Sequence, residues 1–278
     1  MLQGILFTIV VLFIAFLSFL FWRAKRIALY ELQERGLAKI SSVKLLIGLL
    51  QKHRGLSAAK CQGDQSVGGD LSVIKQQVAK LMSSKSLIHE DSERWQSFHD
   101  HWQRLANDKT TVTAENSFQQ HTQLISNLIY LLEDVAQLHK LSAHYLPEFA
   151  YIDFVWRELV NVTESVGQSR AVGTASVTMG HCDSVQLIRL KFLTKHINTI
   201  SAQVLSKITS KNRRTKTMLE AGLSKTRSLT SVIEQEIIDR ERIAISRDEY
   251  FSQATETMTS LNTIFDAQVE EIKKSIAA

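Results

Sequence analysis

The sequence predicts an all-α protein in which an N-terminal transmembrane helix is followed by two antiparallel four-helix bundles. Its 278 residues include one proline, Pro147, and 11 glycines, and the hairpin dipeptides Asn-Gly and Asp-Gly do not occur. Apolar residues recur at helical spacing, as on the face formed by Leu124, Leu128 and Leu131. Hydrophobic residues make up 44% of the chain, which is typical of a folded protein rather than a disordered one.

The first apolar stretch is long enough to cross a membrane. No charged side chain occurs from Leu2 to Trp22, and at about 1.5 Å per residue this helix spans a hydrocarbon core of roughly 30 Å. Because no basic residue precedes it and no Ala-x-Ala cleavage site follows, we expect an uncleaved single-pass anchor rather than a signal peptide. The basic residues Arg23, Lys25 and Arg26 come next, so the positive-inside rule places the remaining chain in the cytoplasm.

Beyond the anchor, the pattern predicts eight helices in two halves, separated by Pro147. A bend is expected near Gly36 and a possible break near Gly222, and Asp183 or Ser184 caps one helix of the second half. The expected helices cover residues 40–62, 71–85, 92–105, 114–145, 148–179, 184–208, 213–243 and 248–276. The corresponding divisions are an anchor (1–26), a helical linker (27–39) and two four-helix bundles (40–146 and 147–278).

Each half carries, on its first helix, an arginine followed by small residues on the same face. Ser57 lies three positions after Arg54, and Gly173 lies three positions after Arg170. Small residues there let a second helix approach, so each guanidinium faces a seam between helices. Gly55 and Gly173 each cost about 1 kcal/mol relative to alanine in a helix, which favours a role in packing or ligand access. The repeat indicates an internal duplication.

A matched pair of arginines is suited to one small anion held from two sides. A guanidinium is a planar fork of donors that meets two oxygens of a planar oxyanion at once, and each charge-assisted hydrogen bond contributes about 1.5–3 kcal/mol. Two buried guanidiniums without an anion repel each other, so an anion that binds between them draws their helices together. We predict Arg54 and Arg170 as the principal ligand-binding residues, with Ser57 and Gly173 beside them.

Several other functional classes are disfavoured. The net charge is +5, but the densest basic run of the soluble part is only Lys211–Arg214, and no basic stripe with interleaved aromatics indicates nucleic-acid binding. Cys61 and Cys182 lie in no paired motif, and His99 and His101 point about 200° apart on a helix, so we expect neither a disulfide scaffold nor a metal site. No catalytic motif occurs. We therefore expect no enzymatic activity and no cofactor.

Three segments carry a family resemblance. Leu50–Ala58 (LQxxRGxSA) resembles the N-terminal motif of the nitrate- and nitrite-sensing (NIT) domain family, and Glu164–Ala171 (ExxGxxRA) is similar to its second motif. Tyr250–Thr255 (YFxxAT), together with Leu261, looks like the family's C-terminal helix pattern. The resemblance covers about residues 40–271, which is nearly the whole soluble part.

The resemblance implies two four-helix bundles that bind nitrate or nitrite between arginine-bearing helices. It also implies a bacterial sensory switch that regulates receptors, kinases, cyclase-type outputs or RNA-binding antitermination modules. Together with the anchor, it predicts a single-pass protein of the bacterial inner membrane. Since no output domain follows the last predicted helix, we expect the signal to leave through a partner protein or through a homodimer.

The chain departs from the family pattern beside both arginines. The family usually places a glutamate directly before each arginine, where this chain has His53 and Ser169. If those glutamates neutralise the arginines in the family, both sites are more positive here. The added charge then either tightens anion binding or changes its selectivity. These residues also allow a third outcome, in which anion binding has been lost. Arg247 precedes the C-terminal motif and is a candidate third contact, for which Arg240 and Arg242 compete with it.

Two functions from different classes follow. The first is a membrane-anchored sensor that binds nitrate or nitrite through Arg54 and Arg170 and signals to a partner. The second is an anchored helical adaptor that docks a partner protein and binds no small ligand. A true ligand stabilises the fold by mass action, by about 2.7 kcal/mol at a hundredfold excess over its dissociation constant, whereas an adaptor shows only a general salt effect.

Overall fold

The computed structural model describes residues 2–87, 91–107, 113–209 and 212–277. Helices dominate these residues and no strand occurs among them, which confirms the all-α prediction. Besides short 3-10 turns, the chain contains two π-helical turns, labelled η3 and η4. In chain order the elements are α1 (Leu2–Cys61), η1 (Gln65–Val67), α2 (Gly68–Met82), α3 (Glu93–Ala106), α4 (Ala114–Leu138), η2 (Pro147–Phe149), α5 (Ile152–Phe154), η3 (Val155–Leu159), α6 (Val160–Met179), α7 (Ser184–Lys207), α8 (Arg213–Val232), η4 (Ile233–Ile238) and α9 (Arg247–Ala277).

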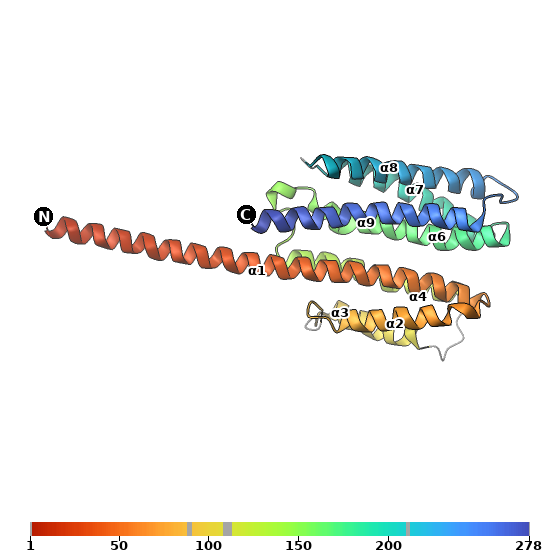
Figure 1. Cartoon of the computed structure of the whole chain (residues 1–278), viewed down its shortest axis with the longest axis horizontal. Helices are drawn as coiled ribbons and strands as arrows, with labels where there is room; N and C mark the ends of the chain where they lie inside the picture. Colours follow the sequence, from red (N-terminus) through yellow and green to blue (C-terminus); the bar gives the residue numbers. More distant parts are fainter. Residues whose placement is uncertain (1, 88–90, 108–112, 210–211, 278) are drawn as a thin grey trace.

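Helix α1 is one uninterrupted helix of 60 residues, so the predicted bend near Gly36 is wrong (Figure 1). Gly36 has a packing role instead. A Cβ at this position would overlap the side chain of His139 and lie 2.8 Å from a methyl carbon of Leu141. The missing side chain therefore lets α1 lie close against the chain that follows α4.

The N-terminal part of α1 has the character of a membrane span. It contains an 18-residue window with a mean hydropathy of 2.3, and no residue of that window is buried in the protein. Figure 1 shows this part extending away from all other helices. Burial begins only at Gln33 and Leu37, where α1 enters the folded part. The chain thus has one N-terminal helix that is long and apolar enough to cross a membrane.

The remaining helices pack in two groups that lie side by side (Figure 1). In the N-terminal group, α1 packs against α2 and α4, and α3 packs against α4. In the C-terminal group, α6 and α8 each pack against both α7 and α9. Contacts of α1 with α9 and α6, and of α4 with η3 and α6, join the two groups. The short connections explain why neighbouring helices are antiparallel.

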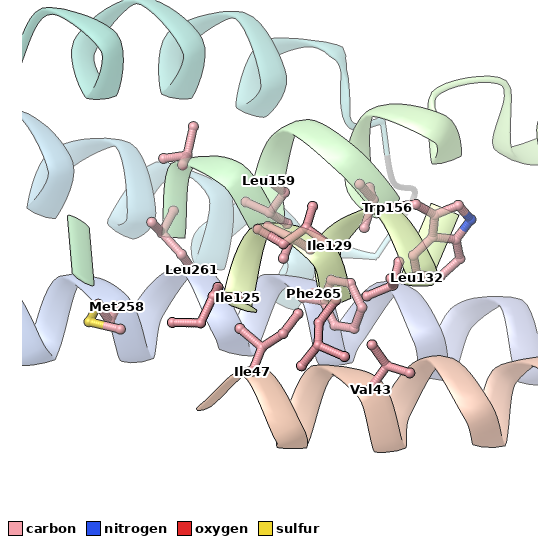
Figure 2. Packing of buried hydrophobic residues seen from close by; sticks show 14 of the residues in the cluster. Val43, Ile47, Ile125, Ile129, Leu132, Trp156, Leu159, Met258, Leu261 and Phe265 are labelled. Atoms are coloured by element: carbon pink, nitrogen blue, oxygen red, sulfur yellow. The ribbon is translucent and has the colours of Figure 1, made fainter. Parts of the chain in front are cut away.

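One continuous apolar core runs through both groups. Figure 2 shows Val43 and Ile47 of α1 facing Phe265 of α9, with Ile129 of α4 and Trp156 of η3 among their neighbours. The rings of Trp156 and Phe265 meet edge to face, with centroids 5.5 Å apart. Since this cluster crosses the junction, the two groups are held by apolar burial as well as by polar contacts.

Several predicted helix ends differ from the structure. Helix α4 ends at Leu138 rather than near Tyr145, because Lys140 adopts a left-handed conformation with φ of 55°. The helix expected to reach Ile243 ends instead in the π-helical turn η4. Gly222 causes no break: a Cβ there would lie 2.7 Å from Ile264, so this glycine allows α8 and α9 to approach. The cap at Asp183 is confirmed.

Candidate functional site

Arg54 lies deep in the protein at the junction of the two groups. It is among the largest fully buried side chains, with 1% of its surface exposed. Gly167 of α6 lies directly opposite, and a Cβ at that position would be 3.1 Å from an Nη atom of Arg54. The glycine of the second motif therefore brings α6 against the arginine of the first motif. The predicted pattern places the small residues after each arginine, whereas Gly167 precedes Arg170.

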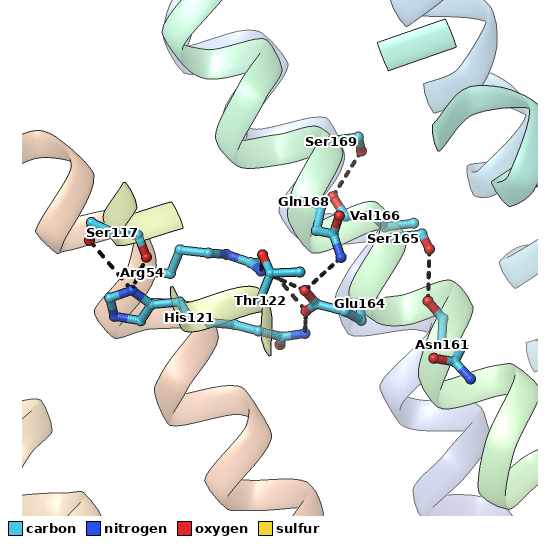
Figure 3. A network of polar contacts seen from close by, with 11 residues as sticks. Arg54, Ser117, His121, Thr122, Asn161, Glu164, Ser165, Val166, Gln168 and Ser169 are labelled. Carbon is cyan, nitrogen blue, oxygen red and sulfur yellow. Dashed lines mark hydrogen bonds and ion pairs between the residues drawn. The ribbon is translucent and has the colours of Figure 1, made fainter. Parts of the chain in front are cut away.

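The guanidinium of Arg54 forms a two-pronged ion pair with Glu164 of α6 (Figure 3). The nitrogen–oxygen distances are 2.5 Å and 3.3 Å. Gln51 and Gln168 each donate a further hydrogen bond to the same carboxylate, at 2.8 Å and 3.1 Å, and Arg54 also donates to Thr122. Arg54 thus has a carboxylate partner from the other helix group.

Arg170 is half-buried one helical turn beyond Gly167, on the same side of α6. It donates a 3.0 Å hydrogen bond to the Thr255 hydroxyl of α9, and its guanidinium lies 5.0 Å from the centre of the Phe251 ring. Among the described residues it forms no ion pair. Burial lowers the pKa of Arg170, and the positive charge of Arg54 lowers it further, against a smaller opposing effect of Glu164.

The two arginines therefore belong to one electrostatic cluster. Glu164 pairs with Arg54, and its charge acts on Arg170 without an ion pair, so the two guanidiniums and one carboxylate leave a net positive charge. The Nε of Arg54 is buried and has no hydrogen-bond partner. A small planar anion suits such a cluster, because it supplies acceptor oxygens and the missing negative charge together.

The two other predicted ligand contacts, Ser57 and Gly173, have neighbours of their own in the structure. The hydroxyl of Ser57 points to His53, at 3.2 Å. Gly173 is a packing position, because a Cβ there would overlap the hydroxyl of Tyr250, which donates a hydrogen bond to the Ser169 carbonyl oxygen. That Ser57 and Gly173 contact a ligand stays a prediction.

Arg247 is also separate from the pair. It is exposed at the start of α9, eight residues before Thr255, which is about 12 Å along a helix. Its charge acts on Asp64, whose pKa is lowered chiefly by hydrogen bonds from Ser66 and slightly by Arg247. Of its competitors, Arg240 pairs with Glu236 in the same turn.

Comparison with known proteins identifies the family. The model of the family described as "NIT: Nitrate and nitrite sensing" matches residues 45–273. The chain belongs to the NIT family. A solved structure described as "Structure of the NasR transcription antiterminator" has the same fold, with a TM-score of 0.68 at 13% identity over 94% of this chain and 74% of that chain. No curated protein matches the chain significantly.

This NIT domain has a buried histidine pair where the family usually places a glutamate. His53, directly before Arg54, lies 2.7 Å from His121 of α4, ring nitrogen to ring nitrogen. The other ring nitrogen of His121, Nδ1, donates to the Ser117 carbonyl oxygen (Figure 3). A neutral His121 therefore accepts from His53 through Nε2. Burial lowers the pKa of His121 to about 3, against the opposing effect of the hydrogen bond to the Ser117 backbone, and the charge of Arg54 lowers the pKa further. Neutralisation of Arg54 is therefore left to Glu164.

Sequence reasoning missed the residues that complete the cluster. Glu164 and Gln51 stand in the family motifs, but nothing in the sequence shows that the carboxylate of one half pairs with the arginine of the other. Thr255 and Phe251 stand in the C-terminal motif, which could have indicated contact with an arginine. Phe118 of α4, whose ring lies 5.3 Å from the Arg54 guanidinium, belongs to no motif of this NIT domain.

Proposed function

We propose that this NIT chain is a membrane-anchored sensor that binds nitrate or nitrite between Arg54 and Arg170 and signals to a partner protein. The observation that carries the proposal is the imbalance of charge: Glu164 neutralises Arg54, while Arg170 forms no ion pair with any described residue. In the proposal, residues 1–26 form the anchor, 27–39 a helical linker, and 40–146 and 147–278 two four-helix bundles in the cytoplasm. It includes neither catalysis nor a cofactor.

Binding would change the balance of forces across the seam. An anion on Arg170 removes the repulsion between this guanidinium and that of Arg54, so the arrangement with both arginines close becomes more stable. A ligand shifts a conformational equilibrium only by its differential affinity for the two states, and the positive seam supplies that difference. Since Arg54 lies on α1, the same helix that carries the apolar segment, a shift of α1 reaches the membrane directly.

Calorimetry of the full chain in detergent, with nitrate, nitrite, chloride and sulfate, tests the proposal. Arg170→Gln removes one charge and should weaken nitrate or nitrite binding by about tenfold or more, as the loss of a charge-assisted hydrogen bond predicts. Arg157→Gln is the matched control, because Arg157 is exposed on η3 and forms its ion pairs at the surface. If Arg170→Gln binds the anion as well as the parent does, the site assignment is wrong.

Arg54 needs a double variant, because Arg54→Gln alone leaves a buried carboxylate without its partner. Arg54→Gln with Glu164→Gln removes both charges and keeps polar groups in place. We expect the double variant to fold and to lose anion binding. Thermal melting then separates the sensor from an anchored adaptor: only a sensor gains stability with nitrate or nitrite beyond the effect of chloride.

A further inference from the structure

A cleft of about 230 Å³ lies where α1 leaves its apolar segment and meets the folded part. One wall is formed by α1, with Arg26 and Tyr30. A second is formed by the segment after α4, with Tyr145, and by η2, with Glu148. Ile276, near the end of α9, contributes to the third wall. The cleft is smaller than the pockets that take drug-sized ligands, so it has room for a compact polar group.

The Arg26 end of the cleft lies at the depth of lipid headgroups if the apolar segment spans the membrane, and the inference rests on that part of the proposed function. Arg26 follows Trp22 by four residues, which is about 6 Å along a helix. Headgroup layers add roughly 5–7 Å to each side of the hydrocarbon core. Arg26 therefore lies within the headgroup layer, whereas Tyr30, eight residues after Trp22 and about 12 Å along the helix, lies beyond it.

The charges of the cleft are one cation and one carboxylate on separate walls. The guanidinium of Arg26 lies 5.0 Å from the centre of the Trp22 ring, and Glu148 accepts a 3.0 Å hydrogen bond from Ser275. Neither forms an ion pair with any residue that the structure describes. Both side chains belong to exposed residues. The cleft therefore complements a zwitterion better than an anion alone.

We propose that this cleft binds the phosphoethanolamine headgroup of a membrane phospholipid. Arg26 binds the phosphate through its planar fork of donors, and Glu148 accepts hydrogen bonds from the primary ammonium. A choline headgroup has no N–H to donate, and a glycerol headgroup has no positive charge for Glu148. The headgroup would link α1 to the end of α9, so membrane composition would act on the helix that carries Arg54.

Native mass spectrometry of the full chain with equal amounts of phosphatidylethanolamine, phosphatidylcholine and phosphatidylglycerol tests the inference. We expect one bound phosphatidylethanolamine, favoured about tenfold or more over either other lipid, as one charge-assisted hydrogen bond would give. Arg26→Gln should lose this lipid, and Glu148→Gln should lose the preference over phosphatidylglycerol. Both positions are exposed, so neither substitution disturbs the core.

Arg23→Gln is the matched control, because it removes the same charge from the same helix and does not line the cleft. If Arg23→Gln weakens binding as much as Arg26→Gln, the attraction is diffuse and the cleft is not a site. Equal binding of the three lipids also contradicts the inference. A third contradicting result is that soluble phosphoethanolamine binds to the chain as tightly as the intact lipid does. Reconstitution into nanodiscs tests the membrane anchor separately. A chain that does not insert contradicts the proposed anchor and leaves the proposed lipid site of the cleft unaffected.

Discussion

Glu164 supplies the negative charge of the arginine cluster. Its replacement should change protein stability and anion binding in opposite directions. Glu164→Gln keeps the shape of the side chain but leaves Arg54 buried without a negative partner, so we expect a loss of about 3 kcal/mol in the free energy of unfolding. The same variant should bind nitrate or nitrite more tightly, because both guanidiniums then lack a protein carboxylate. Denaturant unfolding and calorimetry measure the two effects.

Glu158→Gln is the control for this prediction, because Glu158 forms a surface ion pair with Arg157. It should change stability by less than about 1 kcal/mol and leave anion binding as it is. Weaker anion binding by Glu164→Gln would show that the carboxylate orients Arg54 for the ligand instead of competing with it.

Gly173 and Gly55 look alike in the sequence, but the structure separates them. A Cβ at Gly173 would overlap the buried hydroxyl of Tyr250, whereas a Cβ at Gly55 meets nothing within 4 Å. We expect Gly173→Ala to destabilise the protein by about 1–3 kcal/mol through overpacking. Gly55→Ala should stabilise it by up to about 1 kcal/mol, because alanine is the better helix former. Thermal unfolding should show a lower melting temperature for Gly173→Ala and a higher one for Gly55→Ala. Equal shifts of the melting temperature would contradict the packing role of Gly173.

At the scale of the element, α7 begins with a reciprocal capping box. The Asp183 carboxylate accepts from the backbone of Gln186 at 2.8 Å, and the Gln186 side chain accepts from the backbone of Asp183 at 3.1 Å. Asp183→Ala removes one of these bonds and should cost about 1 kcal/mol, whereas Asp183→Asn keeps an acceptor and should cost little. Chemical denaturation distinguishes them, and an Asn variant as unstable as the Ala variant would exclude the cap as the cause.

The helices could largely be predicted because they depend on local chemistry. Asp183 as a cap follows from its side chain, and the apolar periodicity of α4 follows from the sequence alone. The straight path of α1 through Gly36 could not be predicted, because the reason for that glycine lies in His139, far along the chain. The candidate site behaves likewise. Arg54 and Arg170 stand out as a repeated motif, but the ion pair with Glu164 exists only once the two halves pack together.

At the scale of the whole molecule, polar contacts at the junction tie the N-terminal group to the C-terminal group. Arg54 of α1 pairs with Glu164 of α6, and Arg189 of α7 pairs with Glu115 of α4 at 2.7 Å. The third contact is that of Lys44 on α1, which donates to Asn262 on α9. Because two of these contacts are on α1, movement of α1 relative to the C-terminal group must change both of them.

Lys44 is buried, and its positive charge lowers the free energy of unfolding. Desolvation lowers its pKa from 10.5 to about 8, against opposing effects of Asp266 and Glu164. A depressed lysine pKa means that the unfolded chain holds the proton more tightly, so the penalty is present in full below pH 8 and declines as the pH rises from 8 to 10.5. A shift of this size corresponds to an upper limit of about 3 kcal/mol.

Lys44→Met replaces the ammonium by an apolar side chain of similar length. We expect it to stabilise the protein by about 1–3 kcal/mol at pH 7, and the gain should shrink at pH 10, where the parent lysine has already released its proton. Urea unfolding at both pH values measures the difference. Lys52→Met, at an exposed position of the same helix, should show no such dependence on pH. A Lys44→Met variant that is less stable at pH 7 would show that the contact with Asn262 outweighs the desolvation of the ammonium, and that α1 is held to α9 by this polar contact.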